Sequence, residues 1–155
     1  MPKILDITVY PNDILRQTSK EVEISNIASK ELLVFVEDLK KTMSKKDGVG
    51  LAAPQVGKNI RLIVIHTKDK IIVMINPQIT RKSIGCEVME EGCLSVPNYF
   101  GNVKRHKKIT CFYLDETGKR MKVESEGLMA RVIQHEIDHL DGVLFIDKAA
   151  DLKNI

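Results

Sequence analysis

The sequence predicts an α+β fold, with antiparallel or mixed β-sheets packed around a helix near the C-terminus and an amphipathic helix nearer the N-terminus. Two segments show the three- and four-residue apolar spacing of helices, and β-branched runs bounded by turn residues lie between them. Because strands and helices do not alternate, an α+β fold is favoured over a parallel βα fold. At 155 residues the chain can bury one core, so we expect residues 1–155 to form a single domain.

Composition is that of an ordinary globular protein, with 43% hydrophobic and 29% charged residues. No apolar run approaches the roughly 18 residues that a membrane span needs, and no leader with a small-residue cleavage site is visible. We therefore expect a cytoplasmic protein without a membrane partner. The net charge of +3 is far below that of a dedicated nucleic-acid binder, so DNA is not expected as a partner.

The first helix is predicted at residues 27–43, where apolar residues recur at helical spacing. Glu37 and Lys41 form a pair on its solvent side. Gly48 is expected to end this segment in the left-handed conformation that helix exits favour. Residues 1–25 mix short apolar stretches with turn signals, which predicts an extended arm with at most one short strand or helical turn.

The middle of the chain predicts strands separated by glycine-rich segments. Residues 48–57 hold three glycines and a proline, which is typical of backbone that approaches another strand or a ligand rather than of a helix or open strand. Residues 61–66 and 71–76 predict a hairpin, and residues 85–89 predict a further strand. Cys93 follows in a segment marked by glycine and proline, where a strand bends or ends.

A second hairpin is predicted at residues 109–114 and 119–124, with Cys111 inside it. The last helix is predicted at residues 127–140, with Ser125 as its cap. Its apolar residues are numerous enough for the helix to be largely buried.

The last helix carries the pattern His-Glu-x-x-His. His135 and His139 lie one turn apart on one helical face, so both imidazoles can reach one metal ion while Glu136 stays close to it. Glu136 can take a proton from metal-bound water and return it to a leaving group. The alternative is a pair of hydrogen-bonded core histidines, but it leaves the buried carboxylate of Glu136 without a cationic partner.

Two histidines are too few for a catalytic metal site, which needs a third protein ligand. Zinc peptidases of this type usually take it from downstream, yet the segment after His139 has little room for one. Upstream, the soft-ligand candidates are Cys86, Cys93 and Cys111, which are expected to be reduced thiols. Cys86 and Cys111 fall in predicted strands, where small buried hydrophobes are common. Cys93, at a bend, is the better candidate.

At this point the chain resembles the peptide deformylases. Three motifs of that family stand here in order: Gly-Val-Gly-Leu-Ala-Ala-Pro-Gln at residues 48–55, Glu-Gly-Cys-Leu-Ser at 91–95 and Gln-His-Glu-Ile-Asp-His-Leu at 134–140. The resemblance covers nearly the whole chain. It implies that Cys93, His135 and His139 bind one divalent metal ion, with iron(II) as the expected native ion and zinc, nickel or cobalt also able to occupy the site.

The resemblance also implies a reaction. Metal-bound water attacks the formyl carbon of an N-formylmethionyl peptide, Glu136 accepts the proton, and formate leaves a free N-terminus. The side-chain amide of Gln55 and the backbone N–H of Leu94 hold the developing oxyanion, as in the family. From the residues alone, the alternative is that Gln55 is a turn residue and Leu94 a core residue.

Substrate binding is expected along the glycine-rich segment. If Val49 and Gly50 present free backbone groups opposite Gly92, an extended peptide can bind between them as an added strand, which tolerates many sequences. The family places the methionine side chain in a pocket at positions matching Val49, Met89, Leu128 and Val132. Each of these four could equally be an ordinary core residue.

Two segments depart from the family pattern or stay ambiguous. Residues 98–101 lack an arginine that many bacterial members carry there. The basic run at residues 104–108 favours a solvated sheet edge, and a transient ribosome contact is the alternative. Two other functions remain open: a zinc peptidase that cleaves internal amide bonds, and a noncatalytic metal-binding relative.

Overall fold

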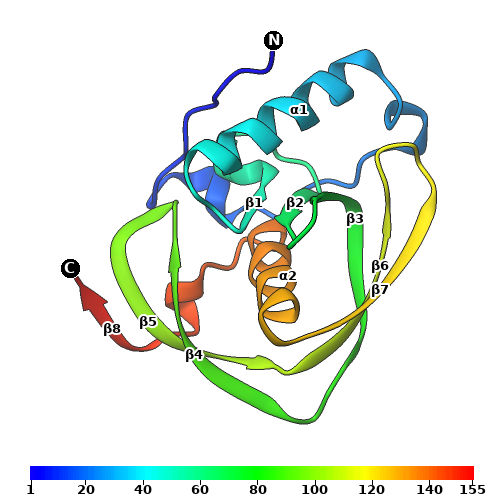
Figure 1. Ribbon diagram of the computed structural model, residues 1–155. Helices are drawn as coiled ribbons and strands as arrows, with labels where there is room; N and C mark the ends of the chain where they lie inside the picture. The colour runs from blue at the N-terminus through cyan, green and yellow to red at the C-terminus, as the bar shows by residue number, and fades with distance from the viewer.

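Two antiparallel sheets and two α-helices make up the fold in the computed structural model, which describes residues 1–155 (Figure 1). The five-stranded sheet has the order β1-β2-β3-β6-β7, with β1 (Gly50–Ala52), β2 (Leu62–His66), β3 (Ile71–Lys82), β6 (Lys108–Leu114) and β7 (Arg120–Glu126). The three-stranded sheet has the order β4-β5-β8, with β4 (Cys86–Cys93), β5 (Val96–His106) and β8 (Ala150–Asn154). The helices are α1 (Lys30–Lys45) and α2 (Gly127–Leu140). The predicted α+β class is confirmed.

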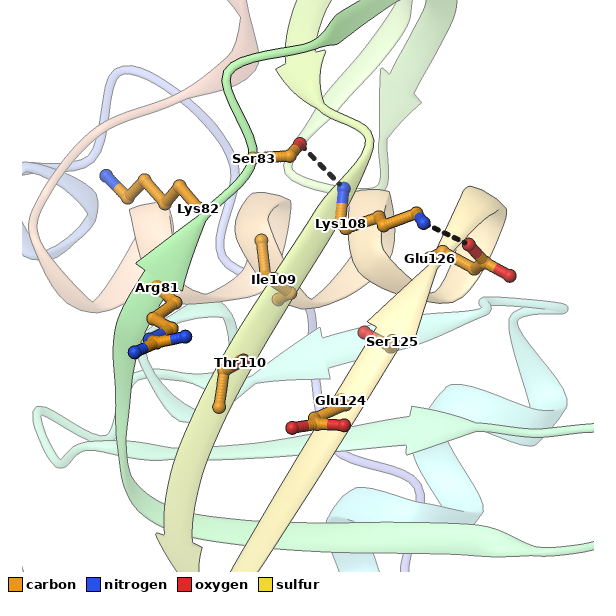
Figure 2. Close-up of a pocket in the computed structure, with 9 residues that line it drawn as sticks. All are labelled: Arg81, Lys82, Ser83, Lys108, Ile109, Thr110, Glu124, Ser125 and Glu126. Carbon is orange, nitrogen blue, oxygen red and sulfur yellow. Dashed lines mark hydrogen bonds and ion pairs between the residues drawn. The ribbon is translucent and has the colours of Figure 1, made fainter.

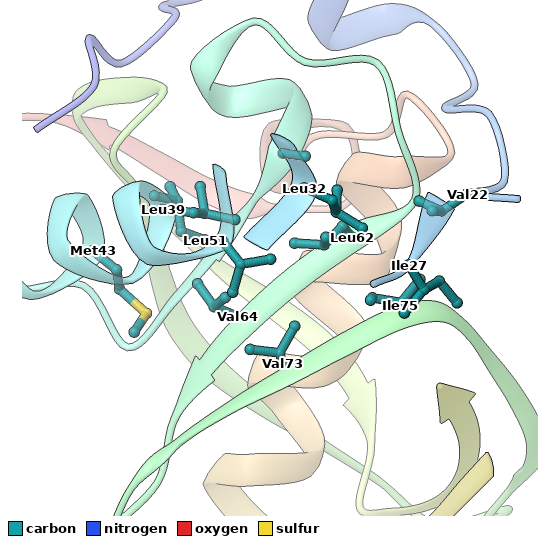
Figure 3. Close-up of a cluster of buried hydrophobic side chains, with 12 residues drawn as sticks. Val22, Ile27, Leu32, Leu39, Met43, Leu51, Leu62, Val64, Val73 and Ile75 are labelled. Carbon is teal, nitrogen blue, oxygen red and sulfur yellow. The ribbon is translucent and has the colours of Figure 1, made fainter. Parts of the chain in front are cut away.

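Strand β2 is buried on both faces, because α1 covers one face of the five-stranded sheet and α2 covers the other. Because side chains alternate along a strand, Leu62 and Val64 point to one face whereas Ile63 and Ile65 point to the other. Leu62 and Val64 belong to a cluster with buried side chains of α1 (Figure 3). Ile63 and Ile65 pack in a second cluster with α2. The unbroken apolar run of β2 follows from these two contacts.

Helix α1 begins at Lys30, three residues after the predicted start at 27. Ser29 sets this boundary, because its hydroxyl accepts a hydrogen bond from the backbone N–H of Leu32 at 3.2 Å. At the other end, Asp47 rather than Gly48 adopts the left-handed conformation, with φ 55°. The prediction for Gly48 was wrong because α1 ends at Lys45, three residues before the glycine, and Asp47 makes the left-handed turn.

The predicted surface pair of α1 is also corrected. Glu37 pairs with Lys40 at 3.0 Å, whereas Lys41 donates to the carbonyl oxygen of Pro2 at 3.1 Å. Both spacings place residues on neighbouring parts of a helix surface, so the contact with the N-terminal arm decides between them. In that arm, Asp13–Arg16 and Ile24–Asn26 form 3-10 turns, which is more regular structure than the sequence predicted.

Both predicted hairpins are confirmed. Strands β2 and β3 pair with Leu62 opposite Ile75, and β6 and β7 pair with Leu114 opposite Arg120. Helix α2 has the predicted bounds. Its predicted cap is wrong, because Glu126 occupies the cap position and makes no side-chain capping bond, and the buried hydroxyl of Ser125 has no hydrogen-bond partner.

Three strands were absent from the sequence prediction, and two run longer than predicted, since β3 continues past residue 76 to Lys82 and β4 past residue 89 to Cys93. Segment 48–57 contains the short strand β1, which pairs with β2, and then a 3-10 turn at Ala53–Val56. Strand β5 was missed, because glycine and proline interrupt its start and a basic run ends it. It pairs with β4 along its length, from Cys86 opposite His106 to Cys93 opposite Val96. Strand β8 was also missed, and it pairs with β5 at the chain's C-terminal end.

Helix α2 lies between the two sheets (Figure 1). One side packs on the five-stranded sheet through apolar residues, and the other meets the three-stranded sheet through hydrogen bonds and ion pairs. None of the helices combines the length and apolar character needed to cross a membrane. The site described below lies where α2 meets the three-stranded sheet.

Candidate metal centre and active site

The three predicted ligands converge. One donor atom each of Cys93, His135 and His139 lies within 4.8 Å of the other two. Cys93 is the last residue of β4, and the histidines lie one turn apart on α2. The sulfur of Cys93 is 3.3 Å from Nε2 of His139. The group therefore joins a strand end of one sheet to a helix that packs on the other.

The other two cysteines lie elsewhere. Cys111 is fully buried in the apolar layer between α2 and the five-stranded sheet. Cys86, at the opposite end of β4, contacts His106 with 3.6 Å between its sulfur and Nδ1. Among the three cysteines, only Cys93 meets the two histidines, as its position at a strand end suggested.

Glu91 orients the first histidine. A carboxylate can only accept hydrogen bonds, so Nδ1 of His135, 2.8 Å from Oε1 of Glu91, carries the proton. In the neutral ring the lone pair of His135 is then on Nε2. This is the carboxylate–histidine contact that commonly fixes the tautomer of a metal-binding imidazole.

Two buried arginines hold Glu91. Arg105 donates from Nε to Oε2 at 2.7 Å and from Nη2 to Oε1 at 3.0 Å, and Arg131 donates from Nη1 to Oε2 at 2.5 Å. Burial acts to raise the pKa of Glu91, but hydrogen bonds from His135 and Arg105 outweigh it and lower the pKa to about 2. Glu91 is therefore an ionised acceptor at every ordinary pH.

The burial of Arg105 corrects the prediction that residues 104–108 form a solvated sheet edge. Lys104, Lys107 and Lys108 are exposed, as a solvated edge requires, but Arg105 is only 3% exposed. Its Nη1 donates to Asp138 of α2 at 2.8 Å. The prediction was wrong for this residue, because its two carboxylate partners come from distant parts of the chain.

Glu136 is buried beside the ligand group, and its Oε1 has no hydrogen-bond partner. Burial raises the pKa of Glu136 to about 7, a value suited to both accepting and donating a proton. Gly50 makes room for it, since a Cβ on Gly50 would lie 2.8 Å from Oε2 of Glu136. The sequence predicted that the backbone near Gly50 comes close to another strand or a ligand. In the structure it lies close to helix α2.

Gln55 lies beside Cys93. Its Oε1 accepts from the backbone N–H of Ala52 at 3.0 Å, which satisfies the local turn. Its Nε2 donates to the hydroxyl of Ser95 at 3.1 Å and is 3.5 Å from the Cys93 sulfur. Sequence reasoning missed Ser95, whose only signal was its place in the second motif. Gln55 is therefore a turn residue whose amide N–H₂ is also fixed beside the site.

A cleft of about 520 Å³ opens over this group. Every residue assigned to substrate binding lines it: Val49, Gly50, Met89, Gly92, Leu128 and Val132. Leu94, Gln55 and Glu136 line it as well. Val49 and Leu128 are 54% and 60% exposed, so they are not ordinary core residues, whereas Val132 also belongs to the buried cluster beneath.

A second cleft of about 400 Å³ lies at the ends of β3, β6 and β7 (Figure 2). Ile109 is its single apolar residue. Lys108 bonds to the Ser83 hydroxyl through its backbone N–H and pairs with Glu126 through its side chain. No histidine or cysteine lines this cleft, which therefore offers no comparable chemistry.

The donor set fits a divalent transition-metal ion. One thiolate and two imidazoles are typical ligands of zinc and iron(II), and three protein ligands leave a position open. Oε1 of Glu136 is buried without a hydrogen-bond partner, and Glu136 lines the same cleft as Cys93 and His135, so a bound cation would compensate its charge. The residues present thus match such an ion in number and in type.

The family model for polypeptide deformylase matches residues 4–154. A peptide deformylase of Thermodesulfovibrio yellowstonii is 43% identical over 155 residues, which cover 97% of this chain and 92% of that protein. The crystal structure of a Thermotoga maritima peptide deformylase has a TM-score of 0.90 and 40% identity, covering 95% of this chain and 98% of that one. A Met-Ala-Ser-bound class I type b enzyme from Acinetobacter baumannii has a TM-score of 0.91 and 33% identity, covering 96% and 99%.

Fold, identity and coverage together define the chain as a hydrolase. The chain belongs to the polypeptide deformylase family, and it is an enzyme of that kind.

Proposed function

We propose that this enzyme removes the formyl group from N-formylmethionyl peptides and releases formate. The observation that carries the proposal is the buried carboxylate of Glu136, which has a free oxygen and stands beside Cys93, His135 and His139 inside an open cleft. The family to which the chain belongs supports the same reaction.

Cys93, His135 and His139 would bind one divalent ion, iron(II) in the native enzyme, with zinc, nickel or cobalt as substitutes. When bound, the ion supplies a Lewis acid and lowers the pKa of water. Glu91 supports this role by accepting a hydrogen bond from Nδ1–H of His135, which leaves the other nitrogen of the neutral imidazole free to bind.

Glu136 moves the proton. Its carboxylate accepts a proton from the attacking water, and the water oxygen forms a bond to the formyl carbon. The same proton then passes to the peptide nitrogen as the C–N bond breaks, so that formate and a free amine leave. A pKa near 7 suits both halves of this transfer.

Gln55 and Leu94 are proposed to stabilise the oxyanion. Nε2 of Gln55 is held beside Cys93 by Ser95, and Leu94 follows Cys93 in the chain. Donors fixed in advance need no reorganisation when charge develops on the formyl oxygen.

The peptide is proposed to bind as an added strand between Val49–Gly50 and Gly92, with its methionine against Met89, Leu128 and Val132. The Acinetobacter baumannii relative was solved with Met-Ala-Ser bound, which supports a peptide as the ligand of this chain. We also propose that the enzyme acts in the cytoplasm on nascent chains, with no more than a transient ribosome contact.

Incubation with formyl-Met-Ala-Ser and with unformylated Met-Ala-Ser tests the proposal. We expect formate from the first peptide and no cleavage of either peptide at an internal bond. Cleavage of internal bonds without formate would support a zinc peptidase instead.

The Glu136→Ala variant tests the role of Glu136. We expect it to keep its metal and to lose nearly all deformylase activity, while Glu124→Ala, on the surface strand β7, behaves like the wild type. Full activity of Glu136→Ala would contradict the mechanism. Metal binding by the wild type without any formate release would indicate a noncatalytic relative.

A further inference from the structure

The ligand group depends on how two parts of the fold are held together. Cys93 belongs to β4 of the three-stranded sheet, whereas His135 and His139 belong to α2. The apolar cluster on the other side of α2 involves the five-stranded sheet and no residue of β4 or β5. The separation of α2 from β4 must therefore be set by contacts on the polar side of the helix.

Arg131 makes the most extensive of these contacts. It is buried, and it follows the same four-residue spacing on α2 as His135 and His139. Its Nη1 donates to Glu91 at 2.5 Å and to the carbonyl oxygen of Val103 at 2.9 Å, and its Nη2 donates to the carbonyl oxygen of Glu87 at 2.6 Å. One helical side chain thus bonds to the backbone of both β4 and β5.

Arg131 also holds the carboxylate that orients a ligand. Glu91 accepts a hydrogen bond from His135 on one oxygen and from Arg131 on the other. Two residues that lie one turn apart on α2 therefore bond to the same carboxylate. The planar guanidinium suits this contact, because it presents several donors in a fixed geometry. Loss of Arg131 would leave Glu91 with one arginine partner in place of two, and it would leave the carbonyl oxygens of Glu87 and Val103 without this donor.

We propose that Arg131 is a positioning residue for the metal ligands. It fixes β4 against α2 and Glu91 against His135, and so sets the Cys93/His135/His139 group before an ion binds. The inference rests on the proposed function, because it requires these three residues to bind metal. Arg105 has a different role. Because it bonds both oxygens of Glu91 itself, Glu91 keeps a cationic partner when Arg131 is replaced, and only the contacts between α2 and the strands are lost.

The test compares release of cobalt(II) from the wild type, Arg131→Met and Arg131→Lys into excess chelator, together with the cobalt–thiolate absorption of each. Substitution of groups that orient metal ligands commonly costs roughly 10–100-fold in metal affinity. We expect Arg131→Met to release cobalt at least roughly tenfold faster, with a shifted thiolate band, and Arg131→Lys to fall between it and the wild type.

Ile133→Val is the matched control. Ile133 lies on the apolar side of α2, is fully buried and contacts the five-stranded sheet, so its truncation loosens the helix without touching β4. We expect wild-type cobalt release from this variant. Wild-type release and spectrum in Arg131→Met would overturn the inference, as would equally fast release from Ile133→Val. If Arg131→Met does not fold, Arg131→Lys alone decides, since unchanged release from it also overturns the inference.

The same measurements separate this inference from the proposed function. A wild-type protein that takes up no cobalt and shows no thiolate band contradicts the proposed metal site, and the inference falls with it. A wild type that binds cobalt through its thiolate, beside an Arg131→Met variant that binds it equally well, contradicts the inference alone.

Discussion

The two sides of α2 differ in chemistry and in what they do. Toward the five-stranded sheet the helix presents side chains such as Ala130, Ile133 and Leu140, all fully buried among other apolar groups. Toward the three-stranded sheet it presents Arg131 and Asp138, each bonded to charged partners. Apolar contacts are non-directional and stabilise the helix by area alone. Charged hydrogen bonds are directional, so they can fix the positions of reacting groups.

The difference teaches that stability and geometry come from separate surfaces of one helix. A lost methyl group on the apolar side leaves a small cavity that neighbours can partly fill. A lost partner on the polar side leaves a buried charge or donor unpaired, which costs more and moves the ligands. The predictions below test this separation.

The largest effect is expected from Glu91→Ala. The change leaves Arg105 and Arg131 buried without their shared carboxylate, and breaking a buried ion pair typically costs about 3–5 kcal/mol. Denaturant unfolding of the metal-free protein measures the loss. Glu87→Ala, an exposed position on the same strand, should stay within about 0.5 kcal/mol of the wild type. A loss below about 1 kcal/mol in Glu91→Ala would show that the polar side contributes little to stability.

Gly50→Ala should have the next largest effect, and it acts from the five-stranded sheet. The added Cβ would lie 2.8 Å from Oε2 of Glu136 and 2.9 Å from Cγ1 of Val132, so α2 or β1 must shift. Overpacking of this kind costs about 1–3 kcal/mol, and displacement of Glu136 should lower kcat by roughly 100-fold. Steady-state kinetics check the result against Gly85→Ala, where the nearest atom is a flexible lysine carbon at 3.7 Å. Wild-type kcat in Gly50→Ala would mean that Glu136 tolerates displacement.

Thiol reactivity should distinguish the two sheets. Burial raises the pKa of Cys111, in the apolar layer, to about 11, so its thiolate is scarce at neutral pH. Cys86, on the three-stranded sheet, is only half-buried. Mass spectrometry after brief alkylation of the folded Cys93→Ala variant should find label on Cys86 and little on Cys111. Equal labelling would indicate that the apolar layer opens readily.

The smallest effect is expected from the exposed pair of Arg16 and Asp147. The hydrogen bond from Arg16 lowers the pKa of Asp147 below its usual value of 3.8. A lowered carboxyl pKa stabilises the fold above pH 3.8, and this contribution is lost as the pH falls through the lower folded value. Because both side chains are more than a third exposed, Asp147→Asn should cost only about 0.2–1 kcal/mol at pH 7. Unfolding measured at pH 7 and in steps below pH 3.8 follows this cost, and a cost that does not shrink as the pH falls would argue against an ionic origin.

The sequence predicted the parts of the fold that have a regular apolar pattern. Helix α2 and both hairpins were found because periodicity and turn residues agree there. Strand β5 and the burial of Arg105 were not, because a basic run is read as solvated unless its partners are known. Those partners, Glu91 and Asp138, are 14 and 33 residues away in the chain. Their contact is a product of the tertiary fold.

The site was predictable to the extent that its residues occur in motifs. Cys93 was selected from three cysteines by its position at a strand end, and the geometry brings it to His135 and His139. Arg131 could not be selected, because its partners include two backbone carbonyl groups, which leave no trace in side-chain pattern.

Metal content of three cysteine variants tests the central claim most directly, namely that a residue from the three-stranded sheet completes a site on α2. Cys93→Ala, Cys86→Ala and Cys111→Ala are purified anaerobically, loaded with iron(II) or zinc, and analysed for bound metal. We expect one equivalent of metal in Cys86→Ala and Cys111→Ala and almost none in Cys93→Ala. Full metal content in Cys93→Ala, or its loss in either of the other two, would contradict the account.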